Sequence, residues 1–148
     1  MEEGQKIVIV VPGEPIAQGR PKFSTKDGYY RAYDPPASRE YKQVVLLHAL
    51  RQMRRREPME GPLSLSVRVY RSVPTSWSEK RKRMAYAGQI RPVSRPDTDN
   101  YVKGVLDSLE GVVFQNDSQV VEYHEPFGKW YSDRPRVEIE VKEIRDGI

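Results

Sequence analysis

The sequence contains no cysteine and only two histidines. The absence of cysteine excludes disulfide scaffolds, zinc ribbons, iron–sulfur clusters and thiol catalysis. Two histidines leave little material for a histidine-rich metal site or a Ser-His-Asp triad. No apolar run is long enough to span a bilayer, so no transmembrane helix is expected. Any chemistry that this chain performs must therefore depend on carboxylates, lysine and metal ions.

The length of 148 residues is that of one domain, and we expect a single domain over residues 1–148. The first residues are acidic and soon reach Pro12, which does not resemble a secretory signal peptide. We therefore expect a soluble, cytoplasmic protein without a membrane partner.

Charge is distributed unevenly along the chain. Residues 1–96 hold 19 Lys+Arg against 9 Asp+Glu (net +10), and residues 97–148 hold 6 against 12 (net −6). Packing of two complementary charged halves is one explanation. The other is a surface that binds a polyanion around an acidic metal pocket.

Hydrophobic periodicity predicts an α+β domain. Gly61-Pro62 and Gly111 bound two of the periodic segments, and an Asp27-Gly28 turn suggests a short hairpin in the proline-rich loop at 12–36. The resulting order predicts a small mixed or antiparallel sheet packed with two to three helices. The predicted strands are 6–11, 63–70 (half-buried), 119–123 and 136–144, and the predicted helices are 35–56, 79–87 and 97–110.

The segment beginning at residue 97 carries the strongest chemical signal. Asp99, Lys103 and Asp107 are spaced i, i+4, i+8 and share one helix face, and Asp97 lies two residues before Asp99. Magnesium prefers oxygen ligands and usually takes one or two carboxylates with waters and substrate phosphate. Asp117 lies in the chain turn that follows the short apolar segment after this helix, and it is a natural third carboxylate. We expect Asp107 to be structural or to support a ligand indirectly, rather than to bind the metal itself, because it lies more than two turns from Asp97.

The same residues have a purely structural interpretation. Aspartate is a favoured helix N-cap, and acidic residues suit a helix N-terminus. Asp99 and Lys103 also have the spacing of an ordinary surface ion pair. Spacing alone therefore leaves both the metal site and the capping role open.

The pattern D-x-D-N-x-x-K occurs at 97–103, an aspartate follows at 107, and N-D-S-Q-V-V occurs at 116–121. With these motifs, residues 95–121 resemble the RusA family of Holliday-junction resolvases. The earlier segment Gly19-Arg20-Pro21-Lys22 is similar to the early Gly-Arg-Pro-basic element of that family. The resemblance implies a RusA-like fold over most of the chain.

The resemblance also implies roles for individual residues. It identifies Asp97, Asp99 and Asp117 as metal-binding carboxylates and Lys103 as the catalytic lysine. It implies Mg²⁺ as the cofactor, with Mn²⁺ as a substitute, and a homodimer that nicks opposing strands of a four-way junction. Relatives often carry a second aspartate where this chain has Asn116.

Basic side chains outside this segment are candidate DNA-binding residues. In a basic protein that handles DNA, such side chains contact backbone phosphates, although runs of charge are more often simply solvated. The candidates are Arg20, Lys22, Arg54, Arg55, Arg56, Lys80, Arg81, Lys82 and Arg83.

The sequence thus supports two functions of different classes. The first is a Mg²⁺-dependent, structure-selective endonuclease that resolves four-way junctions by paired nicks, in DNA recombination and repair. The alternative is a protein that binds branched DNA without cutting it, in which the acidic residues only cap and pair.

Overall fold

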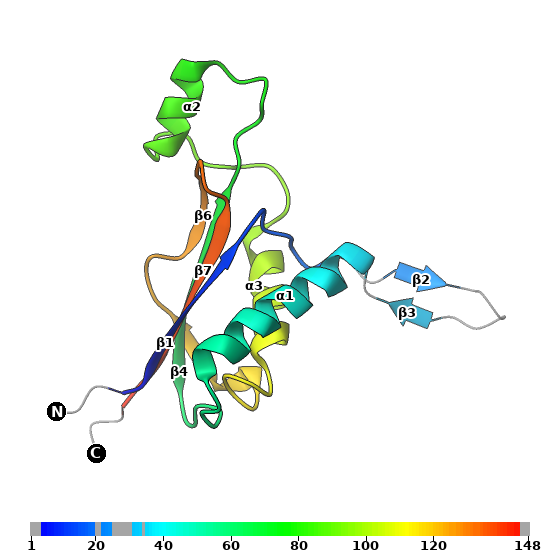
Figure 1. The fold of residues 1–148 in the computed structure, drawn as a ribbon, viewed down its shortest axis with the longest axis vertical. Coiled ribbons are helices and arrows are strands. Elements are labelled where there is room, and N and C mark those ends of the chain that lie inside the picture. Colours follow the sequence, from blue (N-terminus) through cyan, green and yellow to red (C-terminus); the bar gives the residue numbers. More distant parts are fainter. Residues whose placement is uncertain (1–3, 20–21, 25–30, 34, 146–148) are drawn as a thin grey trace.

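The computed structural model describes residues 4–19, 22–24, 31–33 and 35–145. In them, helices α1 and α3 lie against one face of a mixed five-stranded sheet, and α2 projects beyond one end of it (Figure 1). The predicted α+β class is confirmed. The strands are β1 (Lys6–Pro12), β2 (Lys22–Ser24), β3 (Arg31–Tyr33), β4 (Leu63–Arg71), β5 (Val120–Tyr123), β6 (Gly128–Tyr131) and β7 (Arg136–Glu143). The helices are α1 (Pro36–Met53), α2 (Glu79–Tyr86), α3 (Thr98–Leu109) and the short 3₁₀ helix η2 (Asp117–Gln119).

The sheet is built around β4. Its antiparallel part runs β1–β7–β4, and both β5 and β6 then pair parallel with β4. β5 pairs with Leu63–Leu65 and β6 with Arg68–Arg71, so the two short strands follow one another along one edge. β6 is not predictable from the sequence, because its four residues show no alternation between apolar and polar side chains.

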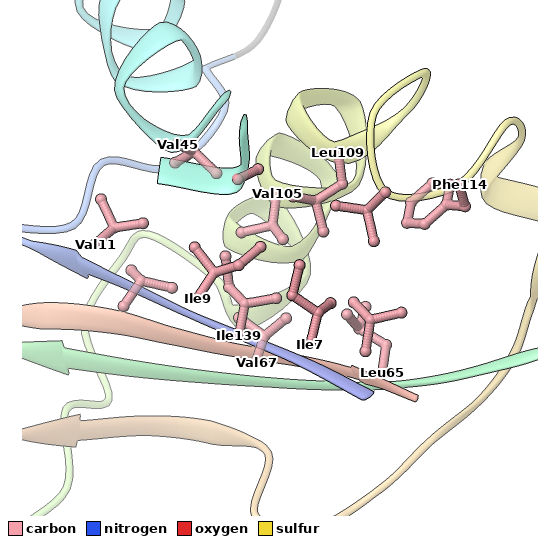
Figure 2. Close-up of a cluster of buried hydrophobic side chains, with 14 of the residues drawn as sticks. Ile7, Ile9, Val11, Val45, Leu65, Val67, Val105, Leu109, Phe114 and Ile139 are labelled. Carbon is pink, nitrogen blue, oxygen red and sulfur yellow. The ribbon is translucent and has the colours of Figure 1, made fainter. Parts of the chain in front are cut away.

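The hydrophobic core lies between the sheet and the two helices (Figure 2). Ile7 and Ile9 of β1 and Ile139 of β7 point from the sheet toward α1 and α3. Val105 and Leu109 of α3 are buried against them. The apolar stripe of α3 therefore packs on the sheet, which fixes the direction of the helix that carries the acidic motif.

The prediction of a half-buried β4 is wrong. Ser64 and Ser66, on its polar side, are fully buried because the segment after β5 crosses over them. Ser64 Oγ hydrogen-bonds His124 Nδ1 at 2.7 Å, and Ser66 Oγ donates to the carbonyl of Pro126. The serines give β4 the alternation of apolar and polar residues that is typical of a half-buried strand, but the segment after β5 covers the face on which they lie.

The predicted end of the first helix is also wrong. Helix α1 ends at Met53, before the expected end near residue 56, because Arg54 and Arg55 adopt positive φ angles of 50° and 69°. β2 and β3 pair as the expected hairpin, whose turn at Asp27-Gly28 lies outside the described residues. Within the described part, no helix combines the length and apolar character needed to cross a membrane.

Candidate active site on helix α3

Asp97 occupies the N-cap position of α3 without using its carboxylate as a cap. Its backbone is extended (φ −69°, ψ 151°), and its side chain makes no capping hydrogen bond. The carbonyl of Asp97 accepts from the backbone N–H groups of Asn100 at 3.1 Å and Tyr101 at 3.4 Å. The capping explanation for Asp97 is therefore wrong, and its exposed carboxylate is available to another partner.

Asp99 and Lys103 lie one turn apart on the exposed side of α3. Lys103 Nζ lies 4.0 Å from Asp99 Oδ2, and the Lys103 and Asp99 side chains are 64% and 70% exposed, respectively. A pair this open is screened by water and contributes little to stability. The structure thus brings Asp97, Asp99 and Lys103 together at the N-terminal end of one helix.

Asp117 lies near the other end of α3. Its backbone N–H donates to Oε1 of Glu110, the C-cap residue of α3, at 3.4 Å. The 12 residues of α3 span about 18 Å at the usual rise of ~1.5 Å per residue. One copy of the chain therefore does not bring Asp117 to Asp97 and Asp99. Consistently, no cluster of three acidic or histidine side chains suited to a metal occurs within the described residues.

The turn that carries Asp117 is held by side-chain amides. Asn116 Oδ1 accepts from the N–H of Ser118 at 2.9 Å. Gln119 Oε1 accepts from the N–H of Asn116 at 3.0 Å, and Gln119 Nε2 donates to the carbonyl of Met59 at 3.0 Å. Asn116 thus acts as the N-cap of η2, while the carboxylate of Asp117 remains exposed.

Basic side chains hold the loop that leads into Asp97. Lys129 Nζ donates to the carbonyls of Ser94 (3.2 Å) and Pro96 (3.0 Å), and Arg71 Nη1 donates to Ser94 at 3.1 Å. Burial lowers the pKa of the Lys129 ammonium, nearby Arg71 lowers it further, and Asp97 acts in the opposite direction. These contacts are not predictable from the sequence, because the pairing of β6 with β4 brings Lys129 and Arg71 to this loop.

The backbone of the Gly-Arg-Pro-Lys segment starts beside α3. The N–H of Gln18 donates to the carbonyl of Asn100 at 3.2 Å, and the N–H of Gly19 donates to Ser38 Oγ at 3.4 Å. The next residue, Arg20, lies outside the described residues, and Lys22 begins β2. The predicted phosphate-binding segment therefore emerges at the end of α3 that carries Asp97.

Helix α2, which carries the basic cluster at 80–83, projects beyond one end of the sheet (Figure 1). Arg81 lies over the ring of Trp77 at 3.8 Å, and Lys82 pairs with Glu79 at 3.6 Å. Lys80 and Arg83 are exposed and form no ion pair with another residue in the described part of the chain. These two side chains are the more available cations of α2.

The arginine cluster at 54–56 directly follows the C-terminal end of α1. Arg56 donates from Nε to the carbonyl of Met53 at 3.1 Å and from Nη2 to that of Gln52 at 3.0 Å, so it caps the end of the helix. Arg54 and Arg55 are exposed. Because the carbonyl of nearby Met59 binds Gln119, this cluster lies at the end of the molecule that carries Asp117.

A mainly apolar pocket adjoins Asp99 and Lys103. It has a volume of about 350 Å³. Tyr123 and Phe127 stack on its wall with ring centroids 4.6 Å apart, and Tyr123 is 55% exposed. The other lining residues are Thr98, Val102 and Leu106. The acidic motif is therefore bordered by an open apolar surface.

Asp107 has the structural role expected for it. Its Oδ2 lies 3.1 Å from Lys42 Nζ of α1, an ion pair that connects the two helices covering the sheet. The carboxylate of Asp107 therefore pairs with a lysine of α1 and does not belong to the exposed acidic group at the start of α3.

Comparison with known proteins identifies the family of this chain. The model of the family described as "Endodeoxyribonuclease RusA" matches residues 12–142. The chain is also 44% identical over 140 residues to the Bacillus subtilis (strain 168) protein named "Uncharacterized protein YqaN", covering 93% of this chain and 96% of that protein. The family match includes α3, the turn of Asp117 and Lys129. The chain therefore belongs to the RusA family of endodeoxyribonucleases.

Proposed function

We propose that this protein is a Mg²⁺-dependent endonuclease that resolves four-way DNA junctions by paired nicks. The observation that carries the proposal is the exposed group of Asp97, Asp99 and Lys103 at the start of α3, in a chain of the RusA family. The cellular role that follows is DNA recombination and repair in the cytoplasm, where bacterial and prophage DNA is found.

The acidic residues fit a magnesium ion. Asp97 makes no capping bond, and Asp99 contacts Lys103 only at 4.0 Å, so the oxygens of both carboxylates are available. Carboxylate oxygens are the ligands that Mg²⁺ and Mn²⁺ prefer. Asp97 and Asp99 would hold the ion from one end of α3.

Asp117 would complete the site from a second copy of the chain. About 18 Å of helix separates it from Asp97 within one copy, which is too far for a shared ion. In a two-fold dimer, the start of one α3 can face the Asp117 turn of the partner, and the same contact then occurs twice. Such a homodimer has two equivalent sites, as paired nicking of a junction requires.

The chemistry divides between the metal and the protein. Bound Mg²⁺ would activate a water and stabilise the leaving oxygen in phosphodiester hydrolysis. Lys103, with its ammonium exposed beside Asp99, would neutralise the charge that grows on the scissile phosphate. The first two turns of α3 would hold Lys103 and the two carboxylates at fixed positions relative to one another.

DNA would be held by basic side chains around the site. The segment containing Arg20 and Lys22 starts beside α3 and would bind the phosphates nearest the cut. Helix α2 would contact DNA farther along an arm of the junction through Lys80 and Arg83, with Arg81 and Lys82 adding positive charge. The arginines that follow the C-terminal end of α1 would also bind phosphates; they are Arg54, Arg55 and Arg56.

The deciding experiment compares a labelled four-way junction with a linear duplex of the same sequence, in Mg²⁺ or in EDTA. Symmetric paired nicks in the junction alone, lost in EDTA and in Asp99→Asn, are the expected result. Asp107→Asn is the matched control, because it changes an acidic residue of the same helix that pairs with Lys42. Tight junction binding without cutting in Mg²⁺ or Mn²⁺ would instead support the branched-DNA-binding alternative.

A mixing experiment tests the shared site. Asp99→Asn and Asp117→Asn chains, each inactive alone, are co-expressed with different tags and purified as a mixed dimer. If Asp117 acts on the partner's site, the mixed dimer has one intact site and nicks one strand. If all three aspartates acted within one chain, neither site would be intact and no activity would return.

A further inference from the structure

Lys129 of β6 binds the backbone immediately before Asp97. Its ammonium donates to the carbonyls of Ser94 at 3.2 Å and Pro96 at 3.0 Å. Pro96 is the direct neighbour of Asp97. One side chain from the sheet edge is therefore attached at two points to the loop that delivers the first acidic residue.

Two neighbouring arginines hold the loop and the strand that Lys129 connects. Arg71 Nη1 donates to the same Ser94 carbonyl at 3.1 Å. Arg91 Nε donates to the carbonyl of Lys129 at 2.7 Å, and its guanidinium lies 4.3 Å from the ring centroid of Trp130. The loop, the lysine and the strand thus form one connected unit around the start of α3.

The carboxylate of Asp97 depends on this backbone for its position. No capping hydrogen bond holds the side chain, and the side chain is exposed. Its place is set by the peptide groups on either side: α3 holds the following one, and Lys129 holds the preceding one. Residues that orient a metal ligand in this way commonly change metal affinity when they are replaced.

We propose that Lys129 is a positioning residue that sets Asp97 for cation binding by holding the carbonyls of Ser94 and Pro96. This inference rests on the proposed function, because it assigns Asp97 to the metal. A positioning role for Lys129 also differs from a direct role in DNA binding. Two of the three ammonium hydrogens point to backbone carbonyls, and the side chain is only partly exposed.

The test measures Mn²⁺ binding to the protein without DNA, by electron paramagnetic resonance, in wild type, Lys129→Met and Lys129→Gln. We expect Lys129→Met to bind Mn²⁺ about tenfold more weakly. Lys129→Gln should recover part of the loss, because its amide retains N–H donors. Lys6→Met removes the same charge from β1, where Lys6 faces Glu140, and should bind Mn²⁺ as wild type does.

The sign of the change separates positioning from simple charge. A positive charge near a cation site weakens cation binding, so Lys129→Met would tighten Mn²⁺ binding if Lys129 acted only through its charge. Tighter or unchanged binding would overturn the inference. If Lys129→Met does not fold, as judged by circular dichroism, Lys129→Gln supplies the same comparison against wild type.

Junction binding in EDTA provides the second readout. We expect Lys129→Met to bind the junction as wild type does, with the same dependence on salt. Weaker binding with a flatter salt dependence would assign Lys129 to a DNA phosphate and overturn the inference. Failure of the proposed function is distinguishable, because wild type itself would then neither bind Mn²⁺ at Asp97 and Asp99 nor cut the junction.

Discussion

Asp99 and Lys103 face each other across one turn of α3, with Nζ and Oδ2 4.0 Å apart and both side chains about two-thirds exposed. An exposed pair of this kind contributes less than about 0.5 kcal/mol to stability. The position of the pair therefore matters for chemistry rather than for folding, and the two effects can be measured separately.

Lys103→Met should remove cleavage without removing stability. We expect junction nicking to fall by at least about 100-fold, because the variant lacks a cation placed to stabilise developing charge. The urea midpoint should remain near that of wild type, since the ion pair is exposed. Single-turnover nicking and urea unfolding check the two parts. Near-normal nicking would show that Lys103 only pairs with Asp99.

Lys80→Ala combined with Arg83→Ala should weaken DNA binding in a salt-dependent manner. Every phosphate that α2 no longer binds should flatten the plot of log affinity against log salt by about 0.9. Binding of a catalytically inactive Asp99→Asn protein at several salt concentrations measures this slope. Lys6→Ala with Arg145→Ala removes the same charge elsewhere and is the control. An unchanged slope would mean that α2 does not contact phosphates.

Gln119→Leu should destabilise the turn that carries Asp117. The Gln119 amide accepts from the N–H groups of Gln115 and Asn116 and donates to the carbonyls of Met59 and Gly61. Loss of these four bonds should lower the free energy of unfolding by about 2 kcal/mol, at roughly 0.5 kcal/mol or more per bond. Urea unfolding tests this, with Gln115→Leu as the control from the same turn. Equal stability of the two variants would contradict the prediction.

Asn116→Asp should leave stability and cleavage unchanged. Asn116 works here through its side-chain oxygen, which caps the short helix of Asp117, and aspartate caps a helix about as well as asparagine. Thermal unfolding and junction nicking measure both properties. A clear gain in cleavage would instead indicate that a second carboxylate at this position improves the metal site.

His124 should make the protein less stable in mild acid. Burial lowers the pKa of His124 below its ordinary value of 6.5, with Lys142 acting in the same direction and Glu140 and Glu122 opposing. The unfolded chain then binds more protons than the folded chain between the lowered pKa and 6.5. The contribution of His124 to the free energy of unfolding is therefore fully present above pH 6.5, and it decreases as the pH falls through this interval.

The experiment for His124 compares urea unfolding of wild type and His124→Gln from pH 5 to pH 8. The difference between the two proteins should shrink as the pH falls below 6.5, because only wild type loses the contribution of His124. The substitution His48→Gln, at the other histidine, is the control. A difference that stays constant with pH would show that His124 does not titrate in this interval.

Local patterns in the sequence were enough to predict the α+β class, most of the elements and the residues of the acidic motif. Alternation along β7, the apolar stripe of α3 and the spacing of Asp97, Asp99 and Lys103 are all visible in short windows. The family resemblance added the roles of these residues, and the family match over residues 12–142 confirmed the membership.

Which of these residues lie together depends on the tertiary fold. The parallel pairing of β6 with β4 brings Lys129 to the loop before Asp97, although more than 30 residues separate them in the chain. The length of α3, about 18 Å, likewise separates Asp97 at its start from the turn of Asp117, which contacts its C-cap residue Glu110. Strand register and helix direction depend on non-local burial, so no short window of sequence contains them.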